Sequence, residues 1–185
     1  MRVIYTDSFR KMTDDREIIK AIQRNPESGF RLLMATYKEP VYWHIRRLVV
    51  SHDDAQDAAQ EAFVRIFRNF SQYSEGNSFK AWIFRIATNE ALRLIERRHH
   101  ESVSIEGLPG ILADSYVNYG DLEAIHLQKA ILRLPAKQQL AFNLRYYDEM
   151  SYEEIAEVAG SSAASAKMNY HLAKEKIIEY MQKNN

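Results

Sequence analysis

Two helices separated by a glycine turn are predicted between Ser151 and Ile177, and their outward side chains are of kinds that contact DNA. Ser151 is a favourable N-cap for the first helix, and Gly160 can adopt the positive φ of a tight turn. Ser161 or Ser162 then caps the second helix. The N-terminal half of that helix is the half that meets base edges in a helix–turn–helix, and here it presents Ser165, Lys167, Met168, His171 and Lys174. A helical hairpin that only packs is the alternative.

The inward positions of this segment follow helical spacing. In the first helix they are Ile155, Val158 and Ala159, and in the second Ala166, Tyr170, Ala173, Ile177 and Met181.

Charge limits how tightly such a module could bind DNA alone. The chain has 25 Lys and Arg against 25 Asp and Glu, and the second helix contains no arginine. Because phosphate contacts by Lys and Arg supply much of the affinity for DNA, we expect weak binding by this module in isolation.

An acidic face is predicted on the helix that begins after Ser51. Its apolar stripe is Ala55, Ala58, Ala59, Ala62, Phe63, Ile66 and Phe67, and the opposite face carries Asp54, Asp57, Gln60, Glu61 and an exposed Val64. Acids mixed with glutamine and valine could dock a basic partner helix. A solvated helix face is the alternative interpretation.

The helix that Ser78 caps combines basic, amide and aromatic side chains. Its stripe is Phe79, Ile83, Ile86 and Ala87, with Trp82 at the edge; Arg85 and Asn89 share a flank, and Arg93, Arg97 and Arg98 follow. Single-stranded nucleic acid needs charge for phosphates and side chains for splayed bases. The alternatives are a core tryptophan and arginines that favour the helix C-terminus. Glu90 lies near the stripe without an evident reason.

The remaining elements are also helical, so the sequence predicts an all-α protein. Thr13 is expected to cap the first helix, Pro40 to kink or divide the second, and Pro135 to begin another. We expect a helical domain over 13–98, a flexible linker over 99–120 where glycine and proline gather, and a second helical domain over 121–183.

Several classes of protein are disfavoured by composition. The chain has no cysteine, no signal-peptide pattern and no apolar run near the length of a membrane span, in keeping with a reducing cytoplasm. His99 and His100 are adjacent and do not share a helix face, and neither an H-E-x-x-H pattern nor a glycine-rich phosphate loop is present. We therefore expect no metal, no cofactor and no enzymatic activity.

Three stretches, in order, resemble the extracytoplasmic-function (group IV) sigma factors of bacterial RNA polymerase. "DDAQDAAQEAFVRIF" resembles region 2.2, "FKAWIFRIATNEALRLIERR" resembles regions 2.3 and 2.4, and "LPAKQQLAFNLRYYDEMSYEEIAEVAGSSAASAK" resembles region 4. The resemblance covers the chain from about Thr13 to Met181.

The resemblance implies a factor that binds core RNA polymerase and directs it to promoters. Region 2.2 would dock on the β′ clamp coiled coil through Asp54, Asp57, Gln60, Glu61 and Phe63, and region 4 would contact the β flap. Asn89 would read a flipped base of the −10 element, with Arg85 and Arg93 on the backbone. Ser165, Lys167, Met168, His171 and Lys174 would read the −35 element. The acidic stretch from Glu101 to Asp121 would enter the polymerase cleft, and an anti-sigma factor is an expected partner.

One departure concerns the recognition helix. "AKMNYHLAK" has Asn169 and Leu172 where the family commonly has basic residues, so the family's −35 sequence does not carry over. A free-standing dimeric helix–turn–helix repressor remains the alternative function, and a protein–protein scaffold is a third possibility.

Overall fold

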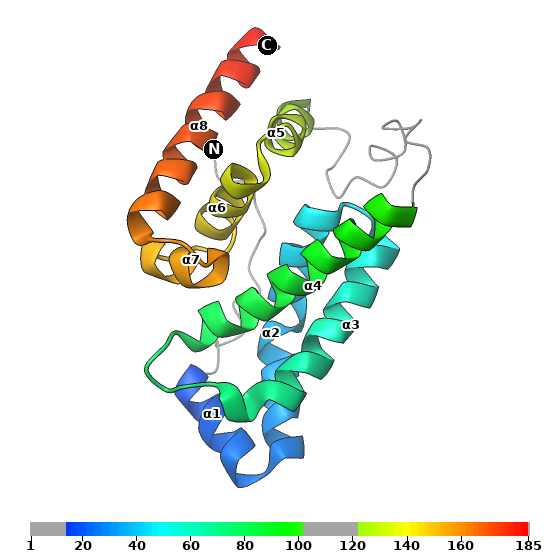
Figure 1. Cartoon of the computed structure of the whole chain (residues 1–185), viewed down its shortest axis with the longest axis vertical. Helices are drawn as coiled ribbons and strands as arrows, with labels where there is room; N and C mark the ends of the chain where they lie inside the picture. The colour runs from blue at the N-terminus through cyan, green and yellow to red at the C-terminus, as the bar shows by residue number, and fades with distance from the viewer. Residues whose placement is uncertain (1–13, 102–121, 185) are drawn as a thin grey trace. The chain divides into compact units, whose positions relative to one another are not determined.

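The computed structural model describes residues 14–101 and 122–184, and every regular element in these two ranges is a helix (Figure 1). The predicted all-α fold is confirmed for this part of the chain. The elements are α1 (Asp15–Arg24), α2 (Pro26–Val49), α3 (His52–Asn69), the 3₁₀ helix η1 (Phe70–Gln72), α4 (Phe79–Glu101), α5 (Leu122–Leu132), α6 (Ala136–Tyr146), α7 (Tyr152–Ala159) and α8 (Ala163–Lys183).

Backbone contacts divide the chain into two compact units between Glu39 and Pro40, within α2. The predicted linker falls mostly on residues 102–121, which lie outside the described residues. The predicted limits of the two domains therefore stay a prediction.

In the first unit, α1 and the start of α2 approach closely because residue 29 has no side chain. Asn25 alone separates the two helices, and its side-chain oxygen accepts a hydrogen bond from the Ser28 nitrogen at 3.0 Å. A methyl group at Gly29 would overlap the backbone nitrogen of Ile22 and lie 2.6 Å from the carbonyl carbon of Ala21. Glycine is therefore required here by close helix packing.

In this first half, the structure differs from the sequence-based expectations at the N-cap of α1 and at Pro40, where α2 was expected to be kinked or divided. Asp14, not Thr13, caps α1, and its side chain accepts a hydrogen bond from the Arg16 nitrogen at 3.1 Å. Helix α2 runs through Pro40 without being divided. The missing N–H of one proline removes a single hydrogen bond, and flanking turns on both sides keep the helix continuous.

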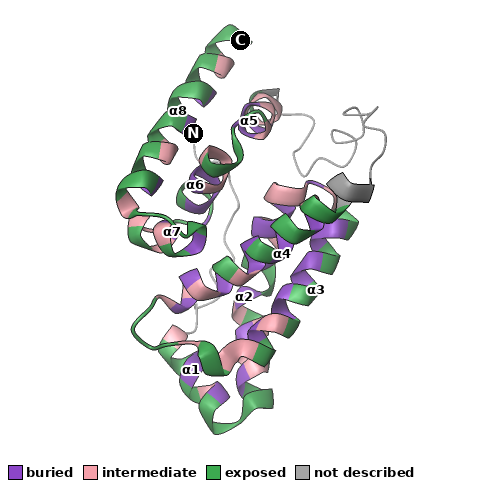
Figure 2. Ribbon diagram, in the orientation of Figure 1, coloured by how far each residue is buried: buried purple, intermediate pink, exposed green. Residues whose placement is uncertain are grey.

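Within the second unit, α3 and α4 pack against each other, and each helix has a serine at its start. Ser51 caps α3 and accepts a hydrogen bond from the Asp54 nitrogen at 3.4 Å, while Ser78 accepts one from the Ala81 nitrogen at 3.2 Å at the start of α4. Both predicted caps are confirmed. Figure 2 shows α3 buried along one side and exposed along the other, as expected of an amphipathic helix.

Helices α5, α6 and α8 share an apolar cluster. Its buried members are Ala130, Ile131, Leu134, Phe142, Ala173 and Ile177, from α5, α6 and α8 and the turn after α5. Pro135 precedes α6 as its N-cap, one position before the first helical turn where it was expected.

A buried polar cluster, which we call the Asp148 cluster, joins the turn after α6 to α2 and α4. Asp148 accepts hydrogen bonds from His44 Nδ1 and from Arg47, both at 3.1 Å. Lys80 donates to the Asp148 carbonyl oxygen, and Thr88 lies 2.9 Å from His44 Nε2.

His44 joins Asp148 to Thr88 through its two ring nitrogens. Nδ1 lies 3.1 Å from the Asp148 carboxylate, which can only accept, so this nitrogen donates. Nε2 lies 2.9 Å from the Thr88 hydroxyl, which also contacts the Phe84 carbonyl oxygen at 2.8 Å.

Burial alone would raise the pKa of Asp148. The hydrogen bond from His44 and the positive charges of Arg47 and His44 outweigh burial and hold that pKa below its ordinary value of 3.8. The carboxylate is therefore ionised at neutral pH although its side chain is only 4% exposed.

We predict that Gly29→Ala lowers the free energy of unfolding by about 1–3 kcal/mol. Alanine is the better helix former by about 1 kcal/mol, so a loss in stability would report the overlap with Ile22 and not helix propensity. Urea unfolding followed by circular dichroism measures the change. Gly76→Ala is the control, because the nearest atom to its added methyl, Ser74 Oγ, is 4.0 Å away. Equal stability of the two variants would contradict the packing argument.

We predict that Asp148→Asn lowers the free energy of unfolding by about 2–4 kcal/mol at pH 7, because it leaves the Arg47 guanidinium without its carboxylate and disrupts the buried hydrogen bond to His44. Since the folded-state pKa of Asp148 is lowered, its contribution is complete above the ordinary value of 3.8 and is lost as pH falls through the folded-state value. The difference between wild type and variant should therefore shrink in acid. Glu149→Gln, at an exposed neighbour, is the control, and an equal loss in both variants would refute the role of burial.

Candidate functional site

The helix–turn–helix forms as the sequence predicts, because each helix end has a specific partner. Ser151 Oγ accepts from the Glu154 nitrogen at 3.1 Å, and the Glu154 carboxylate accepts from the Ser151 nitrogen at 2.8 Å. Gly160 ends α7 with φ 60 and ψ 42, a left-handed conformation. Ser162 then caps α8 by accepting from the Ser165 nitrogen at 3.1 Å. The two helices are therefore joined by a defined turn.

Glu154 also has a partner in α4. The Ser78 hydroxyl donates to its carboxylate at 2.8 Å. Burial would raise the pKa of Glu154, but the hydrogen bonds from Ser151 and Ser78 and the charge of Lys80 lower it. The carboxylate that closes the cap of α7 is therefore ionised at neutral pH.

The inward stripe of α8 packs as predicted. Ala166, Ala173 and Ile177 are buried, and Tyr170 and Met181 are partly buried, packed against the apolar cluster of α5, α6 and α8. The prediction was wrong for one position in α7. Ala159 is exposed, because it is the last residue of the helix and lies beside the turn.

The predicted DNA-reading side chains lie on the opposite side of α8. All five are exposed: Ser165, Lys167, Met168, His171 and Lys174. Met168 has the largest exposed fraction among large apolar residues in the described part of the chain, 60%. These side chains are therefore available to a ligand at the N-terminal half of the helix.

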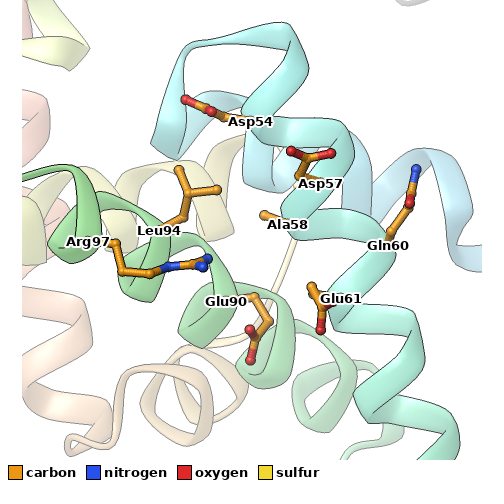
Figure 3. Close-up of a pocket in the computed structure, with 8 residues that line it drawn as sticks. All are labelled: Asp54, Asp57, Ala58, Gln60, Glu61, Glu90, Leu94 and Arg97. Carbon is orange, nitrogen blue, oxygen red and sulfur yellow. The ribbon is translucent and has the colours of Figure 1, made fainter. Parts of the chain in front are cut away.

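The acidic face of α3 borders a hollow of about 400 Å³ between α3 and α4 (Figure 3). The α3 side contributes Asp54, Asp57, Ala58, Gln60 and Glu61, and the α4 side contributes Glu90, Leu94 and Arg97. The polar residues predicted to bind a partner helix are thus brought together, and three residues from α4 join them. Leu94 was missed from the sequence, although it continues the spacing of the α4 stripe through Ala87 and Ala91.

Burial changes the interpretation of three positions on α3. Asp54 and Phe63 were predicted to contact a partner, but each is only 5% exposed. Neither side chain is therefore on the open face of the helix. Asp54 lies in the first turn, where its own backbone nitrogen is held by Ser51. Phe67, expected in the inward stripe, is instead 50% exposed, close to the end of α3 where the helix runs into η1.

Glu90 has a structural explanation that the sequence did not provide. Its carboxylate lies 2.6 Å from Arg65 Nε of α3 and 2.8 Å from an Arg93 guanidinium nitrogen. Glu90 thus pairs with one arginine from each helix and links α3 to α4 beside the hollow. The signal in the sequence was Arg93 three residues later, which is one helical turn.

The outward flank of α4 carries the residues predicted to bind single-stranded DNA. Arg85, Asn89 and Arg93 are exposed, and Arg93 is shared with the Glu90 ion pair. Trp82 is half-buried and stacks on Phe79 with ring centroids 5.9 Å apart. Trp82 therefore packs on the core at its edge and is not the fully buried core residue that the alternative interpretation expected.

No group of three or more potential metal ligands occurs within the described residues. The side chains of His99 and His100 lie outside the described set. None of the helices in the described ranges is both long and apolar enough to span a membrane.

Comparison with known proteins identifies the family. The sigma-70 region 2 model matches residues 33–101, and the sigma-70 region 4 model matches residues 125–177, together about two thirds of the chain. The ECF RNA polymerase sigma factor SigW of Bacillus subtilis is 28% identical over 85% of this chain and 91% of that relative. The chain belongs to the sigma-70 family, in its extracytoplasmic-function group.

Other similar proteins agree with this assignment. The ECF RNA polymerase sigma-E factor of Escherichia coli K12 is 26% identical over 91% of this chain and 94% of its own length. CnrH, solved in complex with the cytosolic domain of CnrY, superposes with a TM-score of 0.71 at 20% identity, over 92% of this chain and 99% of CnrH. The sigma factor RpoE of Bartonella quintana, solved with the anti-sigma factor NepR, gives 0.67 at 23% identity, over 84% and 98%. These two structures show a shared fold.

In the sigma factor, the three groups of exposed residues are divided between two family regions. The flank of α4 and the acidic face of α3 lie in region 2, and the α7–α8 helix–turn–helix lies in region 4. The Asp148 cluster contains residues of both regions.

Proposed function

We propose that this protein binds core RNA polymerase, directs it to promoters through a −10 and a −35 element, and assists promoter melting, without a catalytic step of its own. It would act in the cytoplasm. The observation that carries the proposal is that one chain holds, in the order of the sigma-70 regions, an exposed basic and amide flank on α4 and a capped helix–turn–helix with an exposed second helix.

The flank of α4 is proposed to bind the non-template strand. Asn89 is exposed one helical turn after Arg85, so an amide and a guanidinium face the same side. The amide can pair with the edge of an unstacked base, and the cation can hold its phosphate. Unstacking costs a few kcal/mol, which these contacts would offset.

The acidic face of α3 is proposed to dock on the β′ clamp coiled coil of the polymerase. Asp57, Gln60 and Glu61 are exposed on one side of α3 and border the hollow with Arg97. Asp54 and Phe63 are buried, so they would act indirectly, by holding in place the helix that carries these exposed groups. Region 4 is proposed to contact the β flap.

Neutral net charge is compatible with this function. Two weak DNA contacts joined in one chain, and held by a large enzyme, act together through effective concentration. The polymerase would supply most of the affinity for DNA. An anti-sigma factor is a further proposed partner, in keeping with the complexes in which CnrH and RpoE were solved.

The free-standing repressor makes a different prediction. A dimeric repressor would bind a two-fold duplex site tightly without polymerase. The chain alone, tested by mobility shift at moderate salt, should instead bind duplex DNA weakly, and tight two-fold binding would overturn the proposal.

We predict that Asn89→Ala reduces discrimination among −10 sequences by about tenfold, the value of one good side-chain contact to a base. Transcription from duplex and from pre-melted promoters, each with the preferred and a substituted −10 base, measures it. Gln182→Ala removes an exposed amide in the last turn of α8 and should leave the preference unchanged. An unchanged −10 preference in Asn89→Ala would remove Asn89 from base recognition.

We predict that reversing Asp57 and Glu61 together to lysine weakens binding to core polymerase at least tenfold, because the acidic face then repels a basic partner helix. Affinity is measured by pull-down and by competition with a labelled sigma factor. Glu17→Lys with Glu27→Lys makes the same charge change at exposed positions of the first unit and should have little effect. Equal loss in both double variants would show that net charge, and not this face, matters.

A further inference from the structure

The DNA-facing side of α8 carries an exposed apolar ridge. Ala164, Met168 and Leu172 follow one another at intervals of four residues, so they lie along one side of the helix. Met168 is 60% and Leu172 36% exposed. Water solvates these two large apolar side chains poorly, so covering them with another apolar group would be favourable.

The hydrogen-bonding repertoire of the same helix is limited. Helix α8 contains no arginine, so the bidentate pairing of arginine with guanine is absent. Asn169 is half-buried, and its amide nitrogen donates to the Ser165 carbonyl oxygen at 3.0 Å. That contact holds the amide nitrogen against the preceding turn of its own helix.

The flanking residues indicate what covers the ridge. Lys167 and Lys174 are exposed beside it, on the same flank two turns apart, and their charges suit a phosphate backbone that borders a major groove. Within that groove, the apolar group among the base edges is the C5-methyl of thymine.

We propose that Met168 and Leu172 select thymine in the −35 element by packing on its C5-methyl group. This inference rests on the proposed function, because it takes α8 as the reader of that element. Apolar contact, and not bidentate hydrogen bonding by an arginine side chain, would then be the main source of −35 specificity in this protein.

The test removes the methyl group alone. Holoenzyme reconstituted from core polymerase and the full chain first enriches its preferred duplex from a library randomised at the −35 element. Each enriched thymine is then replaced by deoxyuridine, which has the same hydrogen-bonding groups without the methyl. Open-complex formation should fall about three- to five-fold at one or two adjacent positions, the value of one buried methyl group.

The same comparison with variants assigns the effect to the ridge. In Met168→Ala the thymine and deoxyuridine promoters should be used almost equally. Ile178→Ala is the matched control: its side chain is 51% exposed on α8 but lies in the C-terminal half, so the preference should persist. Circular dichroism checks that both variants are folded.

The outcomes separate this inference from the proposed function. Promoter-dependent initiation without any thymine preference, or with a preference that Met168→Ala retains, overturns methyl recognition and leaves the sigma-factor function standing. Loss of polymerase binding in Met168→Ala would instead assign the ridge to a protein contact and also overturns it. Failure of the holoenzyme to initiate at any promoter overturns both.

Discussion

The carboxylate of Asp148 imposes the strictest requirement in the second unit, because a buried charge must be compensated on every side. Arg47 and His44 supply positive charge from α2, Lys80 bonds the adjacent backbone from α4, and Thr88 orients the imidazole. The Arg47 guanidinium also lies 4.4 Å from the centre of the Tyr147 ring. These contacts join residues about a hundred positions apart in sequence, so they fix the turn from which α7 begins.

The start of α7 in turn determines where the helix–turn–helix begins. Asp148 is two residues before the buried Met150 and three before the cap Ser151. Arg145 donates to the Met150 carbonyl oxygen at 2.6 Å, which closes the turn from α6. Once the cap and Gly160 are in place, the buried stripe of α8 leaves its other side outward. The exposure of the residues proposed to read DNA is therefore a consequence of packing on the inner side.

The protein uses charge in two distinct ways. Buried or shielded ions, such as the Asp148 cluster and the Glu90 pairs, hold helices together within the second unit. Exposed charges are divided between an acidic face on α3 and basic flanks on α4 and α8. Opposite local charges cancel in the sum. A net charge of zero is therefore compatible with an acidic surface proposed to bind a protein partner and basic surfaces proposed to bind DNA.

Much of the fold and of the candidate site was predictable from local sequence. Helix caps at Ser51, Ser78 and Ser151, the turn at Gly160 and the inward stripe of α8 depend on residues within a few positions of each other, and all were predicted correctly. The family motifs are also local patterns. The exposed residues of α8 followed because a stripe of known spacing leaves the other faces outward.

Only the tertiary structure decided the features that depend on residues far apart in the chain. Periodicity placed Asp54 on an open face and Phe67 in the core, but burial depends on which neighbouring elements cover each end of α3. Glu90 had no explanation until Arg65 was found beside it, and the partners of Asp148 lie in helices that precede it by 68 to 104 residues. Helical spacing defines the faces of a single helix, whereas compensation of a buried charge requires the three-dimensional arrangement of several.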